Sequence, residues 1–342
     1  MSGLIADGQA LTLADYESMV TDKDVARKVL IHTIRDYTPF FDQGVILSAN
    51  NGDTDKGQII TKYPEGQLRG YNEGWEAEEA LGAAARYTAS MVRTRSVVDV
   101  SLYNTRKPGE REAWRLRKDQ AFMRGLARQA VRRVFYGDPK TDARDCLGLA
   151  NIVVPTSEAF GGRCIDAGGT TNGKLTDIWL ANWKPEGMYM FYPQGGEGPG
   201  LSVDDMGEQY VQDKNGKAYR ALVTEFGWDI GVAAYDPESV VRICNVDTSK
   251  LSKKNTTASA PDLIDLMTQA LEMLPDDASG RIAFYMNDTI RSVLRRQMQN
   301  KDNAFLTWSE IAGRKVLSYG DTPIHKLGND VIGNDGNVIA FS

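Results

Sequence analysis

The sequence has little of what most enzymes use. Its 342 residues include two histidines, His32 and His325, and three scattered cysteines, Cys146, Cys164 and Cys244, without CxxC spacing. A histidine-based triad or a multi-histidine metal site therefore has few possible members, and the cysteines fit neither a disulfide framework nor a zinc site. We expect each histidine to be solvated or structural.

Binding motifs for cofactors are also missing. No GxxxxGK[ST] occurs, and GGEGPG at 195–200 lacks the following helix and downstream acidic residue of a dinucleotide fingerprint, so we expect a linker there. The stretch NGDTDKGQIITK has Lys56 and Lys62 where a calcium loop requires Gly and Glu. We expect no cofactor and no metal.

Long apolar runs and excess positive charge are absent as well. No window approaches ~20 apolar residues, so we expect no membrane contact. Asp and Glu outnumber Lys and Arg by 46 to 40, and the sequence pI is about 5.2. This balance argues against a general nucleic-acid binder, because such proteins present a net basic face, and any DNA contact should be weak or local. The hydrophobic content of 42% is enough for a substantial core.

Positive charge is concentrated in one segment, REAWRLRKDQAFMRGLARQAVRRVFYGDP. Residues 111–135 carry a local charge of +6 in a chain of net charge −6. Apolar residues recur there at near-helical spacing, which predicts one buried stripe on a helix of about seven turns. The stripe consists of Leu116, Phe122, Leu126, Ala130 and Val134. Gly137, in a left-handed cap, and Pro139 should end the helix.

A second stripe on this helix is formed by Arg124, Arg128 and Arg132, roughly 200° around from the apolar one. These arginines fit three accounts: a solvated face, contacts to a nucleic-acid backbone, or an assembly surface that meets acidic patches on other copies. The acidic remainder of the chain favours the third account over the second. Without evidence of assembly, the solvated face would rank first.

Sequence patterns predict the remaining elements of the first half. Residues 11–37 read as largely helical, with Asp24 as a helix cap. Residues 45–74 form a polar excursion with several turn signals, which we expect to be exposed, with a hairpin as its candidate structure. A short helix is expected at 76–86, followed by a strand within 87–104.

The second half reads as strands followed by an α+β unit. DIWLANWKPEGMYMFYPQ predicts strand, turn, strand, and Asn215-Gly216 predicts a long hairpin between MGEQYVQD and KAYRALVTEFGWDIGVAAYD. The pair Asp204-Asp205 is expected in an exposed loop. After residue 261 we expect a helix, the strand RIAFYMN, a helix capped by Asp288, and two short strands in KVLSYGDTPIHKLG.

Several stretches, taken in order, match a known pattern. They are LTLADYESM, the loop ending YNEGW, the basic segment followed by CLGLANI, DIWLANW with the nearby YPQG, DDMGEQYVQDKNGKAYRALVTEFGWDIGVAAYDPESVVRICNVD, and FYMNDTIRSVLRRQM. On these stretches the chain resembles the major capsid proteins of short-tailed bacteriophages, which have the Hong Kong 97-like (HK97-like) fold. The resemblance spans nearly everything from Leu11 to the C-terminus, and the order and spacing of the stretches carry it.

The resemblance implies an α+β, HK97-like architecture with named parts. They are an N-terminal arm (1–48), an extended loop that reaches over a neighbour (49–105), the spine helix of a peripheral domain (106–145), part of an axial domain with a linker (146–200), the long β hairpin of the peripheral domain (201–250) and the axial domain (251–342). In the prototype, the axial helices precede the final return to the peripheral sheet. Here the hairpin comes first, which implies a permuted connectivity.

The resemblance also implies a function and partners. The chain would be a non-enzymatic major capsid protein that forms hexamers and pentamers of an icosahedral shell around double-stranded DNA. It would be assembled in the host bacterial cytoplasm with a separate scaffolding protein, and the portal and a cement or decoration protein are further expected partners. We predict no covalent cross-linking. Candidates for contacts with neighbouring subunits or with packaged DNA are Arg124, Arg128, Arg132, Lys56, Lys62 and Arg69, with the neighbour ranked first.

Two alternatives remain open at this point. A hydrolase would use carboxylates from the Trp- and Tyr-rich middle of the chain, such as Asp229 beside Trp228. A virion tail or decoration protein would form a ring or a tube instead of a closed shell.

Overall fold

The structure is a computed structural model. It describes residues 11–19, 25–38, 40–62, 66–76, 81–196, 198–251, 261–275, 280–297, 306–311 and 314–341. The helices are α1 (Leu13–Met19), α2 (Val25–Tyr37), α3 (Phe40–Gln43), α4 (Val100–Asn104), α5 (Arg111–Tyr136), α6 (Leu149–Ile152), α7 (Leu263–Glu272) and α8 (Asp288–Gln297). The strands are β1 (Ile46–Ser48), β2 (Thr54–Lys62), β3 (Leu81–Thr88), β4 (Ser90–Asp99), β5 (Cys164–Asp166), β6 (Leu175–Trp183), β7 (Met188–Tyr192), β8 (Leu201–Gln212), β9 (Ala218–Ala234), β10 (Val240–Asp247), β11 (Arg281–Met286), β12 (Leu306–Ile311), β13 (Arg314–Tyr319) and β14 (Thr322–Lys326).

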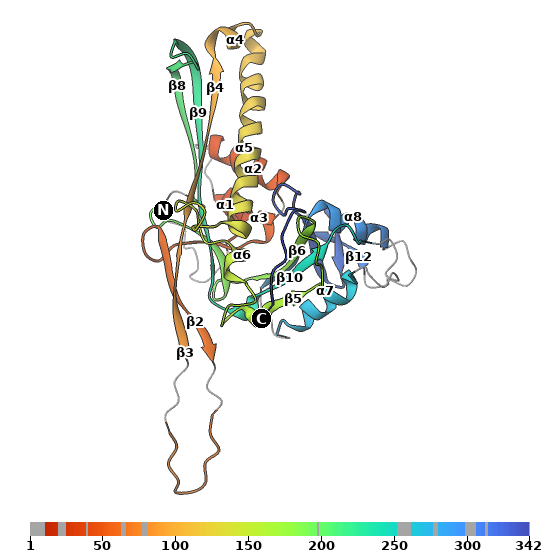
Figure 1. The fold of residues 1–342 in the computed structure, drawn as a ribbon. Coiled ribbons are helices and arrows are strands. Elements are labelled where there is room, and N and C mark those ends of the chain that lie inside the picture. Colours follow the sequence, from red (N-terminus) through yellow and green to blue (C-terminus); the bar gives the residue numbers. More distant parts are fainter. Residues whose placement is uncertain are drawn as a thin grey trace.

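Three parts are visible in Figure 1. We call them the blade (α5 with β4, β8 and β9), the ribbon (β2 and β3 with residues 66–76 at its tip), which points the opposite way, and the side lobe (the seven-stranded sheet with α7 and α8). The predicted order, with the long hairpin before the helical unit, is confirmed.

The blade is an antiparallel sheet with a long helix on one face. β9 lies between β4 and β8 and continues beyond them to pair with β7, which in turn pairs with β1 in parallel. The predicted hairpin around Asn215-Gly216 is confirmed. Asp204 and Asp205 lie within β8, so their placement in a loop was wrong. The Asp205 carboxylate pairs with the Arg115 guanidinium of α5 at 2.6 Å, which ties this strand to the helix.

The helix α5 confirms the main sequence prediction but not all of its buried stripe. Leu126, Ala130 and Val134 are buried, whereas Leu116 is 42% exposed. Leu116 points in the same direction as Val134, eighteen residues later, because eighteen residues make five turns. The first turns of α5, however, extend beyond α1, α2, α3 and the side lobe (Figure 1). These parts therefore do not cover Leu116.

The end of α5 also differs from the prediction. Gly137 has a φ of −58°, so it does not form a left-handed cap. A glycine fits here because a Cβ atom would overlap the carbonyl oxygens of Arg133 and Cys146. The close approach of two backbone segments, and not the backbone angle, therefore explains why position 137 is a glycine.

The blade and the side lobe meet in an aromatic cluster. Phe40, Phe135, Trp183 and Tyr285 are all buried. The ring centre of Phe40 lies 5.5 Å from those of Phe135 and Trp183 and 5.2 Å from that of Tyr285. Contacts of this kind add to the area that each ring buries, so the cluster fixes the two parts together.

The side lobe has its own core on the outer face of its sheet. The strand order is β12-β13-β14-β11-β6-β10-β5, and α7 and α8 supply the apolar side chains that pack on it. The strand-turn-strand prediction for 177–194 is confirmed, but β6 and β7 belong to different sheets. The first turn of α8 is capped by Asn287, whose Oδ1 accepts from the Ile290 amide at 2.9 Å, so the assignment of the cap to Asp288 was wrong.

The N-terminal helices and the ribbon complete the fold. The helical prediction for 11–37 is confirmed by α1 and α2, whereas Asp24 lies outside the described residues. The predicted excursion is confirmed as an antiparallel ribbon that runs from the pair Thr54–Thr88 to the pair Lys62–Leu81. The short helix expected at 76–86 was wrong, because residues 81–86 lie in β3, where pairing with β2 overrides their helix propensity.

One buried histidine is expected to make the side lobe sensitive to acid. The ring of His325 stacks on that of Tyr285 with 5.6 Å between their centres, and its Nε2 atom is buried without a partner among the described residues. Burial, with a contribution from Arg291, lowers the pKa of His325 from 6.5 to about 4. The unfolded chain therefore binds a proton between these two pH values that the folded chain does not.

We expect the free energy of unfolding to fall by about 3 kcal/mol as the pH drops from about 6.5 to about 4, and to show no further loss from this group below that range. Urea unfolding of the unassembled chain at a series of pH values measures this slope. The matched variant His325→Phe keeps a ring on Tyr285 and should flatten the slope. An unchanged slope in that variant would assign the acid sensitivity to another group.

Candidate subunit-contact surfaces

The base of the ribbon is fixed to the blade by a buried carboxylate and three tyrosines. Asp55 of β2 accepts hydrogen bonds from the hydroxyls of Tyr189 at 2.9 Å and Tyr235 at 3.2 Å. Tyr87 of β3 donates to the Ala234 carbonyl at 2.7 Å. Burial raises the pKa of the Asp55 carboxyl, although both tyrosine hydroxyls act against that shift by stabilising the charged form. This joint sets the direction of the ribbon.

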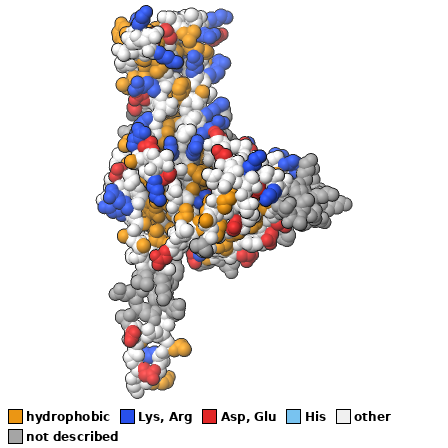
Figure 2. Space-filling view, viewed as in Figure 1, with side chains coloured by type: hydrophobic (Ala, Val, Ile, Leu, Met, Phe, Trp, Pro, Cys, Tyr) orange, Lys and Arg blue, Asp and Glu red, His pale blue; other side chains and the backbone are white. Residues whose placement is uncertain are grey.

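The tip of the ribbon exposes large apolar side chains. Leu68 and Tyr71 are fully exposed, and Trp75 is 66% exposed. The Arg69 guanidinium lies 4.9 Å from the Trp75 ring centre, and its Nε donates to the Glu73 carbonyl at 2.7 Å. Figure 2 shows apolar side chains at this lower end of the molecule, away from the main body. A cluster of this kind is typical of an interaction surface.

The arginine stripe follows one side of α5. Arg128 and Arg132 are exposed and Arg124 is half-buried. Arg128 pairs with Asp330 of the C-terminal segment at 3.4 Å, with both side chains more than half exposed. Figure 2 shows further Lys and Arg side chains over the upper part of the blade. The stripe is therefore largely accessible to a partner.

The other three candidates lie on the ribbon. Lys56 is exposed on β2, and its backbone amide donates to the Asn50 side chain at 3.0 Å. Lys62 is the last residue of β2, and Arg69 is at the tip. The structure therefore divides the six predicted residues between two surfaces, α5 and the ribbon.

The blade face opposite α5 has its charges paired across strands. Arg95 of β4 meets Glu225 of β9 at 2.5 Å. The Arg93 guanidinium donates to the Asp229 carboxylate at 3.0 Å. Asp229, the carboxylate considered for a hydrolase, is therefore half of an ion pair on this face. The two faces of the blade therefore differ in charge. The basic groups on this face are neutralised by acidic partners, whereas several basic side chains on α5 extend into solvent.

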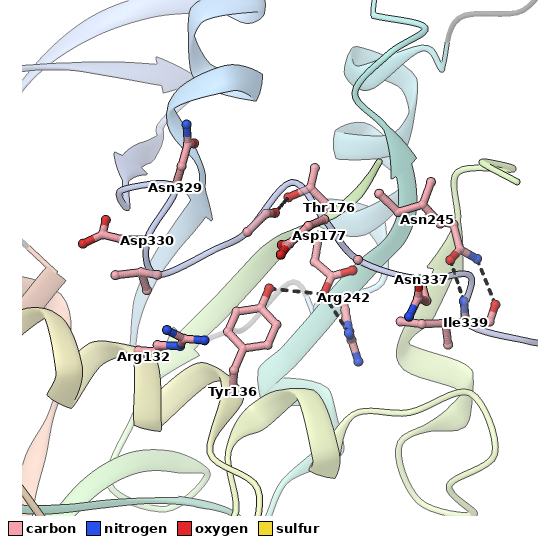
Figure 3. A pocket seen from close by; sticks show the side chains of 15 residues that line it. Arg132, Tyr136, Thr176, Asp177, Arg242, Asn245, Asn329, Asp330, Asn337 and Ile339 are labelled. Atoms are coloured by element: carbon pink, nitrogen blue, oxygen red, sulfur yellow. Dashed lines mark hydrogen bonds and ion pairs between the residues drawn. The ribbon is translucent and has the colours of Figure 1, made fainter. Parts of the chain in front are cut away.

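A polar cleft of about 460 Å³ lies where α5, β6, β10 and the C-terminal segment meet (Figure 3). On its floor the buried Arg242 donates to Asp177 at 2.7 Å and to the carbonyls of Ala150 and Val153 at 2.9 and 3.1 Å. The Tyr136 hydroxyl donates to the same carboxylate at 3.2 Å. Burial alone would lower the pKa of Arg242, but the adjacent Asp177 carboxylate raises it above its usual range. The cluster joins α5, β6, β10 and the segment around α6, and it needs no ligand to account for it.

Groups for catalysis do not converge in the described part of the chain. His32 lies on the surface beside Glu17, and His325 is in the side lobe, so the two histidines are apart. Among the described residues, no three His, Cys, Asp or Glu side chains are grouped to hold a metal ion. Within the same residues, no helix combines the length and apolar character needed to cross a membrane.

Comparison with known proteins decides what this architecture is. Residues 22–339 match the family described as "Major capsid protein GP7". The chain belongs to this capsid protein family. A chain in the near-atomic structure of bacteriophage epsilon15 is 26% identical, with a TM-score of 0.65 and 88% of each chain covered. No curated protein matches.

Two more distant structures extend the comparison. A chain of the bacteriophage JBD30 capsid is 9% identical over 84% of this chain and 90% of its own, with a TM-score of 0.48. A chain of the SrpI encapsulin complex from Synechococcus elongatus is 12% identical over 67% of this chain and 97% of its own, with a TM-score of 0.41. The family match and the epsilon15 structure identify the fold and the family of the chain.

Family membership establishes the general function. This GP7-family protein has the HK97-like capsid fold predicted from its sequence, and it forms the shell of a bacteriophage virion by self-assembly. It is a structural protein and not an enzyme. The hydrolase alternative and the tail or decoration alternative are therefore wrong.

Proposed function

We propose that this capsid protein forms hexamers and pentamers in which the ribbon of each copy lies on a neighbouring copy. The single observation that carries this proposal is the tip of the ribbon, where Leu68, Tyr71 and Trp75 are exposed far from the chain's own core (Figure 1). Burial against a partner is most stabilising for large exposed side chains of this kind. A shell built from identical copies supplies such a partner on every side.

The domain assignment follows from the same proposal. Residues 1–48 form the arm, 49–105 the extended loop, 106–145 the spine helix, and 201–250 and 251–342 most of the peripheral and axial domains. Sheet membership refines these limits, because β6 and β10 lie in the side-lobe sheet, whereas β7 lies in the blade sheet. We assign β6 and β10 to the axial domain. We assign β7 to the peripheral domain together with β4, which also lies in the blade sheet, so the extended loop is limited to residues 49–89. The permutation relative to the prototype remains a prediction.

A shortened ribbon tests the proposal. Lys62 and Leu81 are paired across the ribbon, so an Asn-Gly turn in place of residues 63–80 closes β2 onto β3 with a favourable two-residue turn. We expect this variant to melt at the wild-type temperature as a monomer and to form no shells by sedimentation and negative-stain imaging. Shells at the wild-type yield would contradict the proposed role of the ribbon.

The arginine stripe has a separate role in the proposal. Arg124, Arg128 and Arg132, with Lys56, Lys62 and Arg69 on the ribbon, meet acidic surfaces of neighbouring copies first and packaged DNA second. The acidic net charge of −6 supports the first role, because other copies supply the counter-charge. Other proposed partners are a scaffolding protein, the portal and a cement or decoration protein, with assembly in the host cytoplasm.

Charge reversal distinguishes the two roles of the stripe. In the variant Arg128→Glu with Arg132→Glu we expect shell yield to fall at least about tenfold, a factor that corresponds to about 1.4 kcal/mol. Raising the salt from about 0.1 M to about 1 M should weaken wild-type assembly in the same direction, because the screening length falls from about 10 Å to about 3 Å. Normal shells that hold less DNA would instead assign the stripe to the genome.

A further inference from the structure

An apolar groove lies at the base of the ribbon. It has a volume of about 340 Å³ and is bounded by the body-facing side of β2 and β3 and by residues 147–160. Ile59, Ala83 and Ala85 line one wall, and Leu147 and Phe160 line the other. The exposed side chains of Arg86 and Glu158 stand at its edge. Nothing in the described part of the chain fills this groove.

We propose that this groove receives the ribbon tip of a second copy, so that Leu68, Tyr71 and Trp75 of one subunit insert beside Ile59, Ala83 and Phe160 of the next. The inference depends on the proposed function, because it names the surface on which the ribbon of each subunit lies. Both halves of the contact are apolar at the centre. The tip side chains and Ala83 are exposed in the single chain, Ile59 is half-buried, and Phe160 lines the groove although it is buried. Burying one against the other removes both from water.

Charge at the rims agrees with this pairing. The tip presents the cation Arg69 and the anions Glu73 and Glu76, all exposed. The groove presents the anion Glu158 and the cation Arg86. A docked tip can therefore place Arg69 near Glu158 and an acidic side chain near Arg86, which is the arrangement expected at the edge of a specific contact.

The occupant has to be another copy because the tip of the same chain cannot reach its own groove. β2 and β3 are paired residue by residue up to Lys62 and Leu81, beyond the groove-lining Ile59 and Ala83, so the ribbon continues away from the groove. Residues 66–76 lie at its far end. A contact between two different surfaces of identical chains is heterologous, and contacts of this type generate closed rings such as hexamers.

The contact is tested by blocking each half separately. Ala83→Trp fills the groove, and Ala84→Trp is its matched control, because Ala84 is exposed on the opposite side of the same strand and does not line the groove. The tip variant carries Leu68→Ser, Tyr71→Ser and Trp75→Ser. We expect the groove and tip variants each to reduce ring and shell yield at least about tenfold, with wild-type melting temperatures, whereas Ala84→Trp assembles normally.

Mixing the two defective variants gives the sharpest result. A tip variant keeps its groove and a groove variant keeps its tip, so the mixture retains one intact contact per pair and should give mixed dimers by native mass spectrometry but no rings. Loss of assembly in the tip variant alone, with normal shells from Ala83→Trp, would overturn the groove while leaving the ribbon's role intact. Normal shells from both variants would overturn the groove and the proposed function together.

Discussion

The variant Arg242→Met is expected to lose about 3–5 kcal/mol of unfolding free energy, because it leaves the buried Asp177 carboxylate without its cation. The same change removes the donor for the carbonyls of Ala150 and Val153, which hold the segment after α5 in place. Folded proteins are stable by only about 5–15 kcal/mol, so a loss of this size is a large part of the total. Urea unfolding of the unassembled chain measures it.

Two further variants identify the cause. Arg242→Lys keeps the charge but cannot make all of these hydrogen bonds, so its loss should be intermediate. Arg144→Met breaks the ion pair with Asp142, in which the arginine is 90% exposed, and should change stability very little. If Arg242→Met folds too poorly for urea unfolding, soluble yield and melting temperature rank the stability of the same variants instead. Equal stability of Arg242→Met and wild type would show that Asp177 is solvated.

The variant Gly57→Val is expected to fold but to assemble poorly. Gly57 lies against the ring of Tyr235, and a Cβ atom at this position would overlap that ring. Tyr235 is held by its hydrogen bond to Asp55, so the ribbon has to swing away from the blade instead. Because a shell repeats its subunit contact many times, a misdirected ribbon should reduce shell yield at least about tenfold, even where each contact loses only about 1.4 kcal/mol.

Rescue by a second substitution tests this explanation. The double variant Gly57→Val with Tyr235→Ser removes the obstructing ring, while Tyr189 still donates to Asp55, and should recover shells. Gly57→Val with Tyr235→Phe keeps the ring and should not. Sedimentation of shells gives the yield, and circular dichroism verifies the fold of each monomer. Full assembly of Gly57→Val alone would mean that the direction of the ribbon is not set by this joint.

Periodic and turn-based signals in the sequence predicted much of the fold. The long helix α5 follows from its apolar spacing, and the β8-β9 hairpin follows from Asn215-Gly216 between two strand-like runs. Residues 76–86 show the limit of local patterns. Their alanines and glutamates favour a helix, but the paired strand β2 offers long-range contacts that local propensity does not contain.

The candidate surfaces were only partly predictable. The polar excursion of residues 45–74 correctly indicated an exposed ribbon, but the joint of Asp55 with Tyr189 and Tyr235 brings together residues more than a hundred positions apart. A signal for the buried ion pair was present, since Arg242 and Asp177 each interrupt an apolar strand and a charge in such a strand requires a partner. The sequence pattern could not show that each is the partner of the other.

Amide hydrogen exchange of the ribbon tip tests the central claim most directly, because the unassembled chain and the complete shell differ only in their neighbours. Residues 66–76 are expected to exchange rapidly in the monomer and to become strongly protected in shells, while β9 and α5 stay protected in both. Equal protection of the tip in the two states would contradict the claim that these residues find their contacts on an adjacent subunit.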